Sequence, residues 1–166
     1  MKKLKYEKLD ITIYKHTCKN GLRVYLAPNK NVKSFYATLN VKFGSNILEY
    51  KLDQEQIKIP VGTAHFLEHK VFEQEDGVTP FDYFSALGID CNASTNNVKT
   101  NYLFGGSDHF KKSLNFLLDY VETPYFTDEN VEKEKGIISQ EILMYEDEPG
   151  QKLYNKSLFN TYSKHN

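Results

Sequence analysis

Two histidines and a glutamate fall on one face of a predicted helix within residues 64–69, Ala-His-Phe-Leu-Glu-His. At about 100° per residue, His65 and His69 lie one turn apart, and Glu68 lies beside them. Two neutral imidazoles at this spacing can bind one Zn²⁺, and a neighbouring carboxylate can accept a proton from water at the metal. The spacing therefore predicts a metal site that carries its own base.

A structural alternative exists for the same pattern. A histidine pair on a helix is often only part of a polar face, and the spacing can arise by chance in a chain with five histidines. Phe66 and Leu67 fall on the opposite face, which we expect to anchor the helix in a core. The metal interpretation therefore requires a third ligand elsewhere in the chain.

A catalytic zinc usually has three protein ligands and one open position. The helical pattern over residues 128–147 offers several glutamates: Glu129, Glu132, Glu134, Glu141 and Glu146. Glu141 is the best candidate because Ile138 and Ile142 are among the apolar residues around it, which place it at the border of an apolar stripe. Glu134 lies two turns earlier on the same side, where it either supports the site or is a solvated surface charge.

The other histidines and the cysteines are predicted to be structural or exposed. His16, His109 and His165 do not cluster with the motif along the chain. Cys18 and Cys91 lack the Cys-x-x-Cys spacing of a zinc site, so buried reduced thiols are the better interpretation. Because no apolar segment follows the basic start of the chain, we expect a cytoplasmic location.

Length and charge limit the classes of partner. The chain has 166 residues, a formal net charge of -1 and a pI near 6.5, so no global basic field favours nucleic acid. There is no run of 18 apolar residues, and we expect no membrane partner. One domain over residues 1–166 is predicted.

Hydrophobic periodicity predicts an alternation of strands and helices. Strands are expected over 11–17, 22–26, 34–43, 89–96 and 99–105, and residues 46–61 are expected to be irregular. The motif helix should begin with Thr63 as N-cap and end near 75–77, and further helices are expected over 79–87, 110–122, 128–147 and 152–159. The strand over 89–96 is polar and is expected at a sheet edge. This order predicts an α+β fold, with a mainly antiparallel sheet and helices packed on one side.

Three segments together resemble a known family. They are the motif over 65–69, the run Cys-Asn-Ala-Ser-Thr over 91–95, and the run from Glu134 to Glu141. The order His-x-x-Glu-His is the inverzincin motif. With the other two segments it resembles the insulinase or pitrilysin (M16) family of zinc peptidases, including bacterial members similar to mitochondrial processing peptidase.

The resemblance implies a role for each candidate residue. It implies that His65, His69 and Glu141 bind Zn²⁺ and that Glu68 is the general base. Glu134 matches a further acidic position that supports the site. Asn92 and Ala93 match the edge strand to which substrate backbone adds.

Two departures from the family pattern affect these expectations. The stretch between His69 and Glu141 is somewhat shorter than in typical members. The chain also stops part-way through the first αβ unit, whereas family proteins contain two or four such units around a chamber. We therefore expect an N-terminal part of a longer subunit, completed by the remainder of that subunit and by a second peptidase-like subunit.

The resemblance implies a zinc metalloendopeptidase that cleaves short or unfolded peptides bound as an added β-strand. The isolated chain is expected to be weakly active or inactive, because the later unit of the family supplies an Arg and a Tyr to the substrate carbonyl. A non-catalytic peptide-binding or assembly subunit is the alternative. A structural zinc site is a third interpretation, but such sites normally have four protein ligands, often cysteines.

Overall fold

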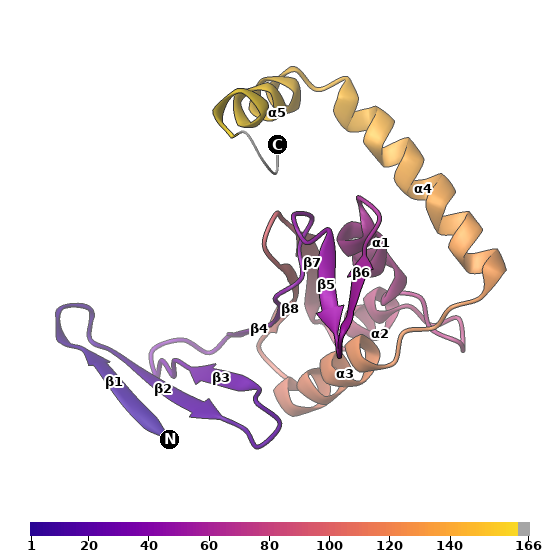
Figure 1. Ribbon diagram of the computed structural model, residues 1–166. Helices are drawn as coiled ribbons and strands as arrows, with labels where there is room; N and C mark the ends of the chain where they lie inside the picture. Colours follow the sequence, from indigo (N-terminus) through magenta and orange to yellow (C-terminus); the bar gives the residue numbers. More distant parts are fainter. Residues whose placement is uncertain (163–166) are drawn as a thin grey trace. The chain divides into compact units, whose positions relative to one another are not determined.

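The computed structural model describes residues 1–162 and shows two compact units (Figure 1). The first unit is Met1–Phe35, and the second begins at Tyr36. The candidate metal ligands all belong to the second unit.

The first unit is a three-stranded antiparallel sheet in the order β1-β2-β3. Its elements are β1 (Lys2–Tyr6), the 3₁₀ helix η1 (Glu7–Leu9), β2 (Ile11–Thr17) and β3 (Arg23–Leu26). The hairpin of β2 and β3 confirms the sequence prediction. Strand β1 was not predicted, because lysines occupy three of its five positions and weaken its apolar alternation.

The second unit contains a three-stranded sheet in the order β4-β8-β7, a separate two-stranded sheet, and five helices. Its strands are β4 (Phe35–Val41), β5 (Glu49–Leu52), β6 (Glu55–Lys58), β7 (Asp90–Thr95) and β8 (Thr100–Gly106). Its helices are α1 (Thr63–Lys70), α2 (Pro80–Ala86), α3 (Phe110–Glu122), α4 (Asp128–Glu146) and α5 (Pro149–Thr161).

One face of the β7–β8 pair packs against helices. The two strands pair antiparallel, and along β8 the alternate residues Thr100, Tyr102 and Phe104 are buried. Phe104 stacks on Phe84 of α2 at a centroid distance of 5.6 Å, and Tyr102 meets Tyr120 of α3 edge to face at 6.3 Å. The fold is therefore α+β with antiparallel sheets, as predicted.

Strand β7 lies at the edge of its sheet, as its polar composition predicted. Its outward side chains, such as Asn92, are exposed, whereas Ala93 and Thr95 are half-buried on the helix side. Within residues 1–162 no strand pairs with its other side. The backbone groups along that side are therefore open to an added strand.

The motif helix differs from the prediction at both ends. Its N-cap is Gly62, whose φ of 88° favours glycine, and the Thr63 hydroxyl donates instead to the Pro60 carbonyl at 2.7 Å. The helix ends at Lys70, well before residue 75, because the next backbone N–H groups form tighter turns, such as that from Phe72 to the His69 carbonyl.

Two further expectations for this region were wrong. Phe66 and Leu67 are only half-buried, and the buried residues of α1 are Ala64, Glu68 and Lys70. Residues 46–61, expected to be irregular, contain the hairpin of β5 and β6, whose turn uses Asp53 at a φ of 54°. Most residues of that hairpin are charged or polar, so its sequence lacks the alternation of apolar and polar residues that predicts a strand.

Helices α2 and α4 begin with side-chain caps. The predicted cap Thr79 is confirmed by a capping box with Asp82, and Thr127 forms the same arrangement with Asn130 at the start of α4. No helix of the described residues is both long enough and apolar enough to span a bilayer.

Gly44 fixes the turn that joins β7 to β8. A Cβ on Gly44 would lie 2.5 Å from the backbone nitrogens of Val98 and Lys99, so only glycine fits without displacing the backbone. The neighbouring Ser45 and Asn46 donate backbone hydrogen bonds to residues 96 and 97, each at 3.0 Å. This close approach holds the β7–β8 turn against the segment that follows β4.

We expect Gly44→Ala to lower the urea midpoint of the second unit, at a cost of about 2–3 kcal/mol, because the methyl group meets backbone rather than a movable side chain. Gly136→Ala is the matched control. Gly136 lies inside α4 with no atom near its Cβ position, so its replacement should stabilise by up to about 1 kcal/mol. Equal midpoints for Gly44→Ala and the wild type would refute the packing argument.

Candidate metal centre

Helix α1 places two imidazoles side by side. The Nε2 atoms of His65 and His69 lie 3.2 Å apart, and the rings meet edge to face with centroids 4.6 Å apart. The four-residue spacing on one helix produces this approach, as the sequence predicted.

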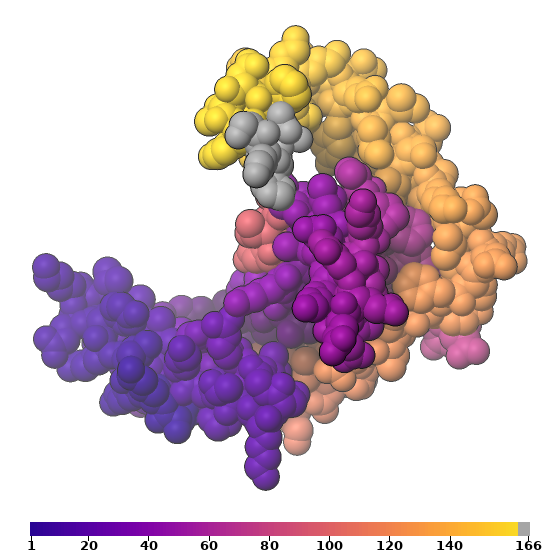
Figure 2. Space-filling view, in the orientation of Figure 1, coloured from indigo at the N-terminus to yellow at the C-terminus, as the bar shows by residue number. Residues whose placement is uncertain are grey.

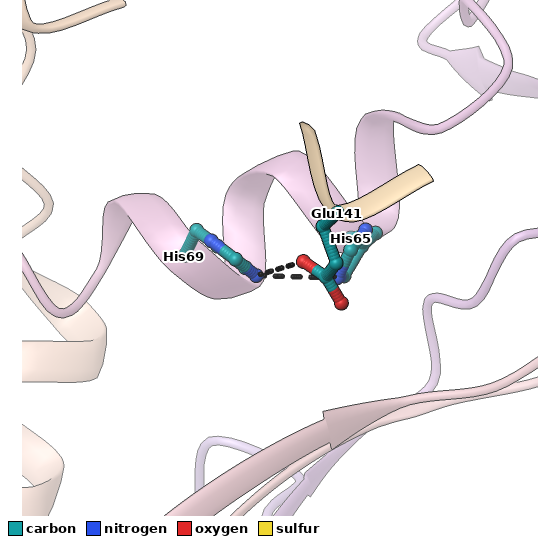
Figure 3. A group of neighbouring side chains, drawn as sticks. All are labelled: His65, His69 and Glu141. Carbon is teal, nitrogen blue, oxygen red and sulfur yellow. Dashed lines mark hydrogen bonds and ion pairs between the residues drawn. The ribbon is translucent and has the colours of Figure 1, made fainter. Parts of the chain in front are cut away.

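Glu141 of α4 brings a carboxylate to the same point (Figure 3). Its Oε2 lies 3.6 Å from Nε2 of His65 and 3.5 Å from Nε2 of His69. Ligands about 2.0–2.2 Å from a tetrahedral Zn²⁺ are separated from one another by roughly 3.3–3.6 Å. The three atoms therefore fit a single zinc ion, and two nitrogens with one carboxylate oxygen match a catalytic donor set.

Glu134 holds the other nitrogen of His69. Its Oε1 lies 2.7 Å from Nδ1 of His69, and its side chain is largely buried. A carboxylate can only accept, so Nδ1 is the donor in this hydrogen bond, and in the neutral ring Nε2 then has the free lone pair. This arrangement orients the ring and makes Nε2 available to a metal.

Glu68 occupies a different environment from Glu141. It is 9% exposed, and its Oε2 accepts a hydrogen bond of 2.5 Å from the Thr95 hydroxyl of β7. Burial, and secondarily the charge of Glu68, raise the pKa of Tyr102 above its usual value. The Glu68 carboxylate thus lies beside the sheet and outside the group of three candidate ligands.

A cavity of about 970 Å³ adjoins these groups, and His65, Glu68 and Glu141 form part of its wall. Ala93 and Thr95 line it from β7, and α5 contributes polar side chains that include Lys152. Figure 2 shows α5 and the end of α4, in yellow and orange, standing away from the body of the second unit. The cavity is therefore bounded by residues of α1, β7, α4 and α5.

The sequence model that describes the insulinase family (peptidase family M16) matches residues 23–166 of this chain. The chain belongs to this family.

Relatives agree with the assignment. The chain is 43% identical over 167 residues to the uncharacterized zinc protease YmfH of Bacillus subtilis, covering 99% of this chain and 39% of that protein. It is 28% identical to the mitochondrial-processing peptidase subunit beta of Rattus norvegicus, over 76% of this chain and 25% of that protein. The crystal structure of an M16-like peptidase from Alicyclobacillus acidocaldarius superposes with a TM-score of 0.89 at 37% identity, over 98% of this chain and 37% of that one. The chain thus spans about two fifths of the length of YmfH and of the Alicyclobacillus acidocaldarius protein, and a quarter of the rat subunit.

The structure of this M16 family member brings together most, but not all, of the predicted site residues. His65, His69 and Glu141 come together, Glu134 contacts His69, and Glu68 and Ala93 border the same cavity. Asn92 does not line the cavity, and its side-chain oxygen accepts a hydrogen bond of 2.8 Å from the backbone N–H of Ala93.

Among the described residues, neither the other histidines nor the cysteines belong to the group of candidate ligands. His16 is in β2 and His109 is the N-cap of α3, at a φ of 64°. His165 lies outside the described residues. Cys18 and Cys91 are free, and both are half-buried rather than fully buried as predicted. Burial and the adjacent Asp90 raise the pKa of Cys91 to about 11, which keeps the thiol protonated and unsuited to bind a metal.

Two residues at this site were not predicted. Thr95 hydrogen-bonds to Glu68. Thr95 lies two residues after Ala93 and therefore on the same face of the strand, and this spacing could have indicated from the sequence that it faces the site. Lys70 is fully buried, pairs with Glu73, and lies 5.8 Å from the Phe126 ring centroid. No sequence pattern indicated that this lysine would face inward.

Glu134→Ala should weaken Zn²⁺ binding by about 10–100-fold, because His69 loses the acceptor that fixes its ring and its tautomer. Competition with a chromogenic chelator measures the affinity. Glu132→Ala is the matched control: Glu132 lies on the same helix, is 71% exposed in its side chain, and pairs only with Lys135. Equal zinc affinities for the two variants would contradict the assigned role of Glu134.

Proposed function

We propose that this chain is the zinc-binding, catalytic part of a metallopeptidase that hydrolyses short or unfolded peptides. The observation that carries the proposal is the convergence of His65, His69 and Glu141, with Glu68 on the wall of the same cavity. The family assignment and the zinc proteases among its relatives support it.

His65, His69 and Glu141 would hold Zn²⁺ as three protein ligands. When bound there, zinc supplies Lewis acidity that polarises a peptide carbonyl and acidifies water. The described residues offer no fourth ligand in this group, which leaves a coordination position open, as catalytic sites require.

Glu68 acts as the general base. Its carboxylate takes a proton from the attacking water while the water oxygen bonds to the scissile carbonyl carbon. The same carboxyl group then gives that proton to the departing amine as the C–N bond breaks. The Thr95 hydrogen bond engages only Oε2, so Oε1 can perform both transfers.

The open edge of β7 is the proposed binding site for the peptide backbone. Edge-facing N–H groups and carbonyls alternate along such a strand, and an extended peptide can pair with them. The Ala93 N–H donates to the Asn92 side chain, which indicates that it faces this edge. We infer that the Asn92 side chain releases it when a peptide adds.

Completion of the active enzyme requires further protein. We infer that the remainder of the subunit and a second peptidase-like subunit close the chamber, since the chain spans about two fifths of its relatives. Apolar side chains near the end of α4, such as Leu143 and Met144, are more than half exposed and suit such contacts. A cytoplasmic location without nucleic-acid or membrane partners stays a prediction from sequence.

A non-catalytic peptide-binding or assembly subunit is the second candidate. The open edge of β7 favours it, because strand addition needs no metal. A pure binding module has no use for a buried carboxylate beside a metal-binding group, so the position of Glu68 favours the enzyme.

Glu68→Gln and Glu141→Gln should lose different properties of the protein, the first its peptidase activity and the second its zinc. Glu68→Gln is expected to keep zinc and to lose cleavage of an unstructured fluorogenic peptide by about 10²–10⁴-fold, because the amide cannot accept the proton. Glu141→Gln is expected to lose zinc as measured by metal analysis. Glu129→Gln, on the exposed first turn of α4, is the control for both. Unchanged cleavage by Glu68→Gln would contradict the mechanism.

Ala93→Pro tests peptide addition to β7. Proline removes the edge-facing N–H, and such a residue is tolerated on an edge strand, so zinc content should be unchanged. We expect the KM for an extended peptide to rise at least about tenfold, because one main-chain hydrogen bond is lost and the ring obstructs the approaching strand. Ala93→Ser keeps the N–H and should bind as the wild type does; a similar KM for both variants would exclude this edge as the binding site.

A further inference from the structure

A chain of polar contacts connects the Glu68 carboxylate to the segment that follows β4. The Thr95 hydroxyl donates to Glu68 at 2.5 Å, and its oxygen lies 3.2 Å from the Thr100 hydroxyl oxygen. The Thr100 hydroxyl in turn donates to the Phe43 carbonyl at 2.8 Å. Helix α1, the β7–β8 pair and residue 43 therefore meet at this point.

The direction of each hydrogen bond follows from the number of protons. Each threonine hydroxyl carries one proton, and both a carboxylate and a carbonyl can only accept. The Thr100 hydroxyl therefore donates its proton in a hydrogen bond to the Phe43 carbonyl, and the Thr95 hydroxyl donates its proton in a hydrogen bond to the Glu68 carboxylate. A bond to an ionised acceptor is stronger than a neutral one, which agrees with the short distance to Glu68.

We propose that Thr95 is a positioning residue that sets the orientation of the Glu68 carboxylate for peptide hydrolysis. A glutamate side chain has several rotatable bonds, and fixing one of its oxygens removes much of that freedom before the reaction begins. With Oε2 held by Thr95, Oε1 is the oxygen that faces the reacting water. This inference rests on the proposed function.

The sheet, rather than Glu68, fixes the place of Thr95. Thr95 is the last residue of β7 and pairs directly with Thr100 of β8. The turn between them is locked by the close approach of Gly44. Thr95 therefore provides Glu68 with a fixed reference on the strand that is proposed to bind the peptide.

This geometry relates the base to its substrate. A peptide added to β7 takes its register from the backbone of that strand, and the base takes its orientation from the side chain at the end of the same strand. The distance between the base and the scissile bond therefore varies less. A displacement of about 1 Å between reacting groups can lower the rate by about 10²-fold.

The test compares Thr95→Val, which removes the hydroxyl at nearly constant volume, with Thr95→Ser, which keeps it. In the zinc-loaded full-length subunit, assembled with any second subunit that it requires, we expect Thr95→Val to lower kcat by about 10–100-fold, with KM within twofold and zinc content unchanged. Thr95→Ser should restore most of kcat. Thr17→Val, an exposed threonine in β2, is the control for loss of a strand hydroxyl.

A second readout needs neither zinc nor activity. In the metal-free protein, the hydroxyl proton of Thr95 should exchange slowly enough to be seen by NMR, because it is held between Thr95 and Glu68. That signal should be absent in Thr95→Val and present in Thr17→Val. Its absence from the wild type would overturn the inference, even if Thr95→Val does not fold.

The outcomes separate this inference from the proposed function. If the wild type binds zinc and cleaves peptides while Thr95→Val has an unchanged kcat, the positioning role alone is overturned. An equal loss in Thr95→Ser and Thr95→Val, or loss of zinc from Thr95→Val, also overturns it, because the effect would then not depend on the hydroxyl. If the full-length subunit, assembled with any second subunit that it requires, cleaves no peptide, the proposed function fails and this inference fails with it.

Discussion

The approach of helix α4 to helix α1 is the contact on which the candidate metal centre depends. Glu134 and Glu141 are seven residues apart, or about 10 Å along the axis of α4. This spacing lets Glu134 bind Nδ1 of His69 while Glu141 reaches Nε2 of the same ring. Both nitrogens of His69 thus face carboxylates of one helix, and Nδ1 is hydrogen-bonded to the nearer of them. A small rotation of α4 would break both contacts, so the helix position and the ring orientation are fixed together.

The first turn of α4 supplies that fixed position. Thr127 and Asn130 form a capping box, and the buried Asn130 also donates to the Tyr125 carbonyl at 3.4 Å. The preceding Phe126 ring lies near the ammonium group of Lys70, on α1. Lys70 follows His69 directly, so the contact at the start of α4 is made next to a candidate ligand. A buried lysine is costly unless it is paired, which explains its ion pair with Glu73.

The sequence patterns identified the candidate site residues, but they did not correctly predict what surrounds those residues in the structure. Glu141 was selected because its apolar neighbours would hold it near a core, yet Ile142 and Leu143 are 51% and 54% exposed. Glu141 therefore faces the imidazole pair without the burial of the apolar stripe on which the prediction depended. Periodicity also identified β7 as an edge strand but not the hairpin of β5 and β6, whose residues are mostly polar and exposed. Thr95 could not be assigned to Glu68 from sequence, because their contact joins a helix to a strand 27 residues away.

The two carboxylates of the site differ in their partners, and this difference explains how they can have separate roles. Glu141 Oε2 faces the Nε2 atoms of two imidazoles at 3.5 and 3.6 Å, which are the separations expected of three ligands around one zinc ion. Glu68 instead accepts a hydrogen bond from the Thr95 hydroxyl, which engages one carboxylate oxygen and brings no charge to it. A carboxylate held in this way keeps one oxygen able to accept a proton. The sequence order of the motif does not show this difference in partners, which depends on the strand that lies beside Glu68.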